Sequence, residues 1–98
     1  MPRGRFVQIT FRFDGPPKMA ELEPIFNKGL DWMRLNNRSW IVWTTSTPEQ
    51  WYNRFKVKLS RNDDVYIVEI NEPEHSGQLR TWQWEWFEKH SRPKTPRR

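Results

Sequence analysis

This 98-residue chain contains no cysteine, which excludes disulfide bonds and thiolate metal sites. It has no apolar run near the length of about 18 residues that a membrane-spanning helix needs, and it shows no signal peptide. The P-loop, the dinucleotide fingerprint and the zinc-ligand spacings are also missing. These absences predict a cytoplasmic protein with no membrane partner and argue against nucleotide-dependent or zinc-dependent chemistry.

Histidine is scarce as well, with only His75 and His90 in the chain. The first falls in a polar loop and the second at the start of the C-terminal tail. Neither has a serine or a glutamate at a spacing that suggests a catalytic unit. We therefore predict that both side chains lie on the surface.

Acidic residues are absent from both ends of the chain. Residues 1–13 and 89–98 hold eight cations and no acid: Arg3, Arg5, Arg12, Lys89, Arg92, Lys94, Arg97 and Arg98. Residues 14–88 hold nine Lys and Arg against all twelve acids, a net charge of −3, although the whole chain carries +5. The segment 91–98 has two prolines and no apolar residue, so it is predicted to be a disordered basic tail. Such a tail either contacts phosphates or only aids solubility.

The first element predicted by hydrophobic periodicity is a strand at residues 6–13, where apolar and polar residues alternate up to Asp14. The next is a helix with one apolar stripe, carried by Met19, Leu22, Phe26, Leu30 and Met33. Because proline is tolerated only in a first turn, Pro24 predicts that this helix begins near Glu23. Asn36 and Asn37 would end it.

Residues 40–43 form an unbroken apolar run, which predicts a central strand covered on both faces. Thr47 then has the features of an N-cap, with Pro48 at the first helical position and Gln50 completing a capping box. The second helix buries a stripe at four-residue spacing, formed by Trp51, Phe55 and Leu59. A basic stripe lies beside it at the same spacing, formed by Arg54, Lys58 and Arg61.

Residues 65–70 read as a third strand after a turn at residues 62–64, and a polar loop follows at residues 71–77. The last element is ambiguous, because its tryptophans alternate as in a strand and also fit one face of a helix. We expect a short extended piece and then a helical turn that starts near Thr81.

This order of elements predicts an α+β fold of the ferredoxin-like βαββαβ type. One domain would span residues 1–90, with two helices on one face of an antiparallel sheet and a Trp-rich C-terminal element. The other face of the sheet would be free for a partner. The Trp-rich element, with Trp82, Trp84, Trp86 and Phe87, is the predicted interface.

The chain resembles the small SinR-like proteins, which are similar in fold to the ferredoxin-like endonuclease subunit of CRISPR adaptation. The resemblance rests on the order and spacing of five features: the strand that ends at Asp14, residues 39–45, residues 47–50, residues 62–70, and Gly77 followed by residues 84–87. It implies a homodimer in which two copies of Asp14 hold a divalent metal, with Mg²⁺ the cofactor of such a site. Phe13 stands here where a tyrosine is common in the relatives.

Asp14 alone supplies too few ligands for a metal-dependent nuclease. Its alternative role is to cap the turn before Pro16. Asp63 and Asp64 read as a plain turn. If the protein is an enzyme at all, a metal-dependent phosphodiesterase with Asp14 as the catalytic ligand is the form that we expect.

We therefore expect a small dimeric protein that binds DNA or RNA with weak sequence preference. Phosphates are contacted by lysine and arginine side chains. The predicted contacts are Arg3, Arg5, Arg54, Lys58, Arg61, Arg92, Lys94, Arg97 and Arg98. The alternative is a protein-interaction module, such as an inhibitor, a toxin or an assembly subunit, that uses a sheet edge or its Trp-rich end.

Overall fold

The structure of the chain is a computed structural model that describes residues 3–70 and 76–91. Its four strands are β1 (Arg5–Arg12), β2 (Asp31–Asn36), β3 (Ser39–Thr44) and β4 (Asp64–Ile70). Its helices are α1 (Met19–Phe26), α2 (Pro48–Phe55), the 3₁₀ turn η1 (Lys56–Lys58) and α3 (Thr81–His90). The strands form one sheet in the order β2-β3-β1-β4, and each neighbouring pair is antiparallel. The predicted α+β class and the antiparallel sheet are confirmed.

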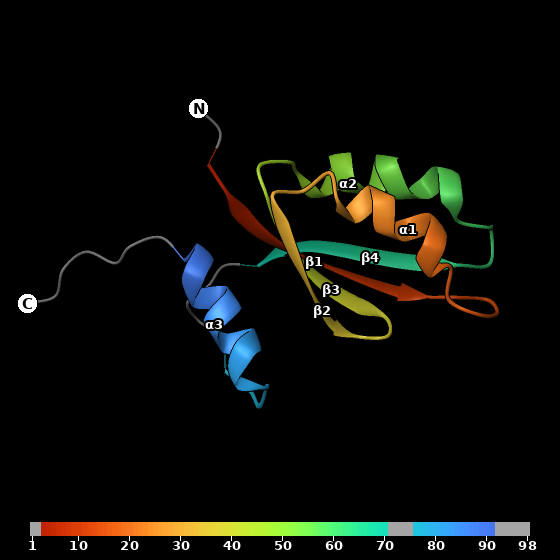
Figure 1. Cartoon of the computed structure of the whole chain (residues 1–98). Helices are drawn as coiled ribbons and strands as arrows, with labels where there is room; N and C mark the ends of the chain where they lie inside the picture. Colours follow the sequence, from red (N-terminus) through yellow and green to blue (C-terminus); the bar gives the residue numbers. More distant parts are fainter. Residues whose placement is uncertain (1–2, 71–75, 92–98) are drawn as a thin grey trace, which may run out of the picture.

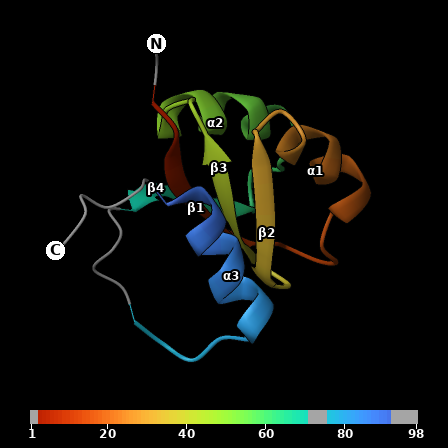
Figure 2. The same cartoon turned by 60° about the vertical axis from the view of Figure 1, so that its left-hand side comes forward.

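The sheet is covered by helices on both faces (Figures 1 and 2). Helices α1 and α2 lie on one face, and α3 crosses part of the other. A first core therefore fills the space under α1 and α2, with Val7, Ile9, Phe11, Leu22, Ile25, Phe26, Trp40, Val42, Trp51 and Phe55 buried in it. A second core lies under α3 and buries Phe6, Met33, Ile41, Trp86 and Phe87. The prediction that the second face is free for a partner is therefore wrong for the part that α3 covers.

Strand β1 has the alternation that its sequence predicts. Val7, Ile9 and Phe11 belong to the first core, whereas Phe6 faces α3 on the other side of the sheet. Strand β1 pairs with β3 on one side and with β4 on the other, so both its edges are occupied. On the second face, Phe6 is the apolar residue of β1, and it lies where α3 covers the sheet, whereas Gln8, Thr10 and Arg12 are polar.

The long helix predicted to end at Asn36 is wrong, because α1 ends at Phe26 and residues 31–36 form β2. Trp32 packs beside the first core and Met33 lies in the second, so these side chains alternate between the two faces of the sheet. The same apolar residues fit both the helical spacing of three to four residues and the two-residue alternation of a strand. Hydrogen-bonded pairing with β3 makes the segment a strand. Helix α1 also begins at Met19 and not near Glu23, so Pro24 lies inside it and the helix has only eight residues.

The central strand at residues 40–43 and the start of α2 are confirmed. Strand β3 lies between β1 and β2, and Thr47 forms the predicted capping box with Gln50. Helix α2 ends at Phe55, however, and the chain continues as η1 and then a turn. Arg54, Lys58 and Arg61 are therefore not one stripe on one helix.

The C-terminal element is a helix of ten residues that starts at Thr81, as expected, with Arg80 in extended conformation before it. Its inward face is formed by Gln83, Trp86 and Phe87, so the alternation of tryptophans does not reflect a strand. The predicted basic tail lies outside the described residues apart from Ser91. Across residues 3–70 and 76–91, no helix combines the length and the apolar character needed to span a membrane.

Candidate nucleic-acid interface

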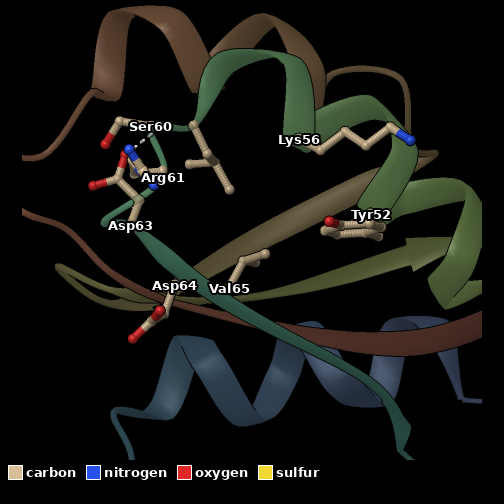
Figure 3. A pocket seen from close by; sticks show the side chains of 8 residues that line it. Tyr52, Lys56, Ser60, Arg61, Asp63, Asp64 and Val65 are labelled. Atoms are coloured by element: carbon tan, nitrogen blue, oxygen red, sulfur yellow. Dashed lines mark hydrogen bonds between the residues drawn. The ribbon is translucent and has the colours of Figure 1, made fainter.

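An open furrow runs between α2–η1 and the outer edge of β4, and we call it the β4 furrow (Figure 3). Two adjoining grooves of about 700 and about 260 Å³ make it up, and both are lined by Tyr52 and Val65. The larger groove is completed by Lys56, Leu59, Ser60, Arg61, Asp63 and Asp64. The smaller one is completed by Pro48, Glu49, Tyr66 and Ile67. The furrow is therefore built from consecutive parts of the chain, α2, η1, the turn that follows and β4.

The aromatic side chain contributed by α2 is Tyr52. Trp51 and Phe55 point into the first core, so the neighbouring Tyr52 is placed on the outer side of the helix, 47% exposed. The ammonium group of Lys56 lies 5.8 Å from the centroid of the Tyr52 ring, a cation–π arrangement. An exposed aromatic ring and a cation thus stand side by side at the furrow.

Strand β4 contributes the second exposed ring. Val65 and Ile67 pack beside the first core, and Tyr66 between them points the other way and is 69% exposed. Strand β4 is an outer strand that pairs only with β1 in the described sheet. Its outer edge therefore presents backbone N–H and C=O groups that no other strand of the sheet uses.

The two aspartates that line the furrow are already engaged by donors of their own chain. The Oδ1 atom of Asp63 accepts a hydrogen bond from the backbone N–H of Asp14 at 2.8 Å. Its Oδ2 atom accepts from Lys18 Nζ at 2.8 Å and from the N–H of Ser60 at 2.9 Å. The Asp14 N–H first, and then Lys18, hold the pKa of Asp63 well below its usual range. Asp63 thus ties the turn before β4 to the end of β1.

Asp64 is engaged in the same way, because its Oδ2 atom accepts from Arg12 Nε at 2.6 Å. By contrast, Lys56, Lys58 and Arg61 are exposed, and within the described part of the chain none of them has an ion-pair partner. The two aspartates of the larger groove are therefore matched by Lys18 and Arg12, and the charge that this groove leaves to an incoming ligand is positive. Glu49, in the smaller groove, keeps its negative charge.

The other predicted cations lie elsewhere. Arg3 is exposed, and Arg5 pairs with Glu69 at 3.4 Å. The register places Arg12, and not Arg5, opposite the start of β4. Since a strand rises about 3.3 Å per residue, Arg5 lies roughly 23 Å along β1 from the end where Arg61 is found. The predicted contacts Arg92, Lys94, Arg97 and Arg98 lie outside the described residues, as does His75.

Arg54 is used inside the fold. Its Nη2 atom donates to Ser46 Oγ at 3.0 Å, and its guanidinium group lies 4.6 Å from the centroid of the Trp51 ring. Trp51 is fully buried, so Arg54 covers the outer side of a core residue. This contact ties α2 to the segment that precedes it.

Asp14 is exposed at the end of β1, and its backbone N–H binds Asp63. In that pair Asp63 is the side chain that caps the turn. Within the described residues no group of three or more His, Asp or Glu side chains is placed to hold a metal ion. Asp14 therefore offers one carboxylate, and a metal site would need a further source of ligands.

The predicted Trp-rich interface divides into buried and exposed positions. Trp86 and Phe87 are buried in the second core, where both rings contact Phe6. Trp84 is partly buried beside the same core, whereas Trp82 is 52% exposed. Trp82 is thus the member of this group with most surface to offer a partner.

His90 is not the surface residue that its sequence position suggests. Its side chain is only 15% exposed, because its ring stacks on Trp43 and its Nε2 atom bonds to Asp31. Tyr52, Lys56 and Tyr66 were also missed as site residues. The available signal was weak: each follows or precedes a buried residue in an amphipathic element, and the sequence does not show that α2 and β4 lie together.

We compared the chain with protein-family models, with curated proteins and with solved structures, and found no match in any of them. The resemblance to SinR-like proteins therefore stays a prediction.

Proposed function

We propose that this protein binds nucleic acid without strong sequence preference and that the β4 furrow holds the phosphate backbone. The observation that carries the proposal is the pair of cations Lys56 and Arg61, which line one groove whose aspartates are already engaged. Cations held along a surface attract phosphates and release their counterions, which is the sequence-independent part of nucleic-acid binding. Lys58 adds a third exposed cation between them along the chain.

We further propose that the domain is ferredoxin-like and related to the SinR-like proteins. The described elements follow the order β-α-β-β-α-β before α3, and β1 lies between β3 and β4. Both observations support that arrangement. The homodimer that the resemblance implies, and the cytoplasmic location predicted from the composition, stay parts of this proposal.

If the chain dimerises, the β4 furrow should stay accessible, so we place the contact at the other outer strand, β2. Helix α3 passes beside this strand, since Gln83 Nε2 donates to the Arg34 carbonyl oxygen at 3.4 Å. Trp82, on the exposed side of α3, is a large apolar group available there. Light scattering of wild type and Trp82→Ala tests this contact.

A protein partner is the second candidate function, and the exposure of Trp82 is the observation that favours it. Trp82→Ala is the informative variant. Replacing Trp86 instead would disturb the second core and could not separate loss of binding from loss of folding. Binding that survives salt and fails in Trp82→Ala would favour a protein partner over nucleic acid.

Cleavage would need a divalent metal such as Mg²⁺ in addition to binding. Asp14 would have to share the ion with a second copy of the chain, because it provides a single carboxylate. A magnesium-dependent nuclease assay on wild type and Asp14→Asn tests this extension, and loss of cleavage in the variant would support it.

The main test is a salt titration of binding to labelled DNA and RNA, followed by fluorescence anisotropy. The double variant Lys56→Ala/Arg61→Ala should bind more weakly, and its salt slope should fall by roughly 1.4 to 2. The matched control is Lys28→Ala/Arg38→Ala, which removes the same charge from exposed positions outside the furrow. Equal losses in the two double variants would overturn the proposal.

A full-length variant in which the four cations of residues 92–98 are replaced by glutamine completes the test. Binding that largely survives these changes is the expected result. If binding vanished with them while Lys56→Ala/Arg61→Ala bound normally, the tail and not the furrow would be the contact.

A further inference from the structure

We infer that the β4 furrow takes single-stranded nucleic acid, with an unpaired base stacked on Tyr52, phosphates beside Lys56 and Arg61, and a further base on Tyr66 where the strand passes over the outer edge of β4. This inference rests on the proposed function and specifies its ligand. The furrow and the adjoining edge of β4 combine two features that the binding of single strands requires: aromatic faces for bases and cations for the backbone.

The first step is the exposure of the two tyrosines, which are the only tyrosines of the chain. Tyr52 is 47% exposed and Tyr66 is 69% exposed, and both residues border the smaller groove. The Tyr52 ring faces the furrow from α2, whereas the Tyr66 ring lies across the edge of β4, on the strand face opposite to Val65 and Ile67. Packing explains every other aromatic side chain of the described residues except Trp82. Base stacking is a use for such rings that tolerates any sequence, because every base has a π face.

The second step is the position of the rings relative to charge. Tyr52 borders both grooves, with Lys56 over its ring and Arg61 farther along the furrow (Figure 3). Exposed Glu49 borders the smaller groove, where Tyr66 lies. Repulsion by Glu49 and attraction by the two cations therefore place phosphates in the larger groove and bases toward the tyrosines.

The third step distinguishes a single strand from a duplex. In a duplex the flat faces of the bases are already stacked on their neighbours, so they are not available to Tyr52 or Tyr66. An unpaired strand exposes both the faces and the edges of its bases. The outer edge of β4 offers backbone N–H and C=O groups to those edges without selecting a sequence.

A peptide that adds a strand to β4 is the competing occupant, since outer strands are known sites of such pairing. The charge of the furrow favours the nucleic acid. A peptide strand would bind through backbone hydrogen bonds and would leave Lys56 and Arg61 without an ion-pair partner. The phosphates of a nucleic acid would contact both cations.

The test measures the affinity of the full chain for labelled oligo(dT) and oligo(rU) of about 12 nucleotides and for a duplex of the same length. Anisotropy is recorded from about 50 to about 200 mM salt. We expect tighter binding to the single strands than to the duplex. Tyr52→Ala and Tyr66→Ala should each weaken binding to the single strand by roughly 5- to 150-fold, the loss expected for one stacked base.

Two further variants keep the result interpretable. Tyr52→Phe retains the ring and should bind as wild type does, which shows that stacking and not the hydroxyl group is used. Val57→Ala, at a neighbouring apolar position that is 73% exposed, should leave binding unchanged. Circular dichroism and urea unfolding confirm that each variant is folded.

The outcomes separate this inference from the proposed function. Equal affinity for duplex and single strand, or tyrosine variants that bind normally, overturns the inference while the effect of Lys56→Ala/Arg61→Ala leaves the proposed function intact. No binding to any of the three probes overturns both. Salt-insensitive pairing of a β-strand peptide with this edge would also overturn the inference and assign the furrow to a polypeptide.

Discussion

His90 Nε2 lies 2.8 Å from Asp31 Oδ2, and this contact joins the last residue of α3 to the first residue of β2. A carboxylate can only accept hydrogen bonds, so Nε2 is the protonated nitrogen of the ring. The same Oδ2 atom accepts from Trp86 Nε1 at 3.0 Å, and Lys89 Nζ lies 3.6 Å away. One carboxylate oxygen of Asp31 therefore contacts three side chains of α3 at one end of the second core.

Asp31→Asn should loosen this end of α3. The amide carries no charge and supplies a single acceptor oxygen, so we expect the free energy of unfolding to fall by about 1 to 2 kcal/mol. The loss is limited because His90 and Asp31 are partly exposed. Urea unfolding measures it, and Glu88→Gln, at an exposed position of α3, is the control. If the two variants were equally stable, Asp31 would not anchor the helix.

The second prediction concerns the stability of the folded chain at acid pH. Burial raises the pKa of Asp31, but hydrogen bonds from His90, the Trp32 N–H and Trp86 outweigh it, so the pKa is lowered overall. The pKa of Asp63 is lowered by the Asp14 N–H and then by Lys18. The unfolded chain therefore takes up these protons first, near pH 3.9. The stabilisation is present above that pH and is lost as the pH falls through the lower pKa of the folded state.

The measurement is the urea midpoint as the pH is lowered from about 6 to about 2. Wild type should lose stability steeply below about pH 4, and Asp63→Asn should show a shallower acid limb because one of the two groups is gone. An unchanged acid limb in Asp63→Asn would contradict the role assigned to this carboxylate.

The third prediction concerns Gly29, in the connection between α1 and β2, where the backbone lies close to side chains of β3 and α2. A Cβ atom at this position would lie 2.6 Å from Val42 Cγ1 and 3.2 Å from Trp51 Cζ2. Both neighbours are fully buried, so Gly29→Ala should cost about 1 to 3 kcal/mol through overpacking. The double variant Gly29→Ala/Val42→Ala removes the nearest clash, and its loss should be smaller than the sum of the single losses. Additive losses would show that the contact is relieved in another way.

The fourth prediction separates two tryptophans that the sequence places in one group. Trp86→Ala should cost about 3 to 5 kcal/mol, because its ring packs on Phe6 and its Nε1 atom binds Asp31. Trp82→Ala should stay within about 0.5 kcal/mol of wild type, since that side chain is half exposed. Equal losses in urea unfolding would contradict the orientation of α3.

The sequence was sufficient where one local pattern decides the structure. The alternation in β1, the apolar run of β3 and the capping box at Thr47 are such cases. It was insufficient where two patterns compete, as at Met33, whose place in the second core depends on pairing with β3. The contact of His90 with Asp31, 59 residues apart, has no local signal at all.

The candidate site was predicted in part for the same reason. Arg61 was identified from its charge, and the structure places it in the furrow. Tyr52 and Tyr66 contribute only because α2 and β4 are brought together, and that depends on the connection through η1 and the turn that Asp63 holds. The charge of a side chain can be taken from the sequence, whereas the groove in which several side chains meet depends on tertiary contacts.

The last prediction tests whether Arg54 acts in binding, as its sequence spacing suggests, or in the fold, as its contacts indicate. Arg54→Lys keeps the positive charge but loses the planar group over Trp51 and the donor to Ser46. We expect a loss of about 0.5 to 1.5 kcal/mol in urea unfolding and no change in affinity for oligo(dT). Lys56→Ala should show the reverse, with nearly normal stability and weaker binding, because its side chain is exposed at the furrow. If Arg54→Lys weakened binding as much as Lys56→Ala while remaining fully stable, Arg54 would belong to the ligand and not to the core.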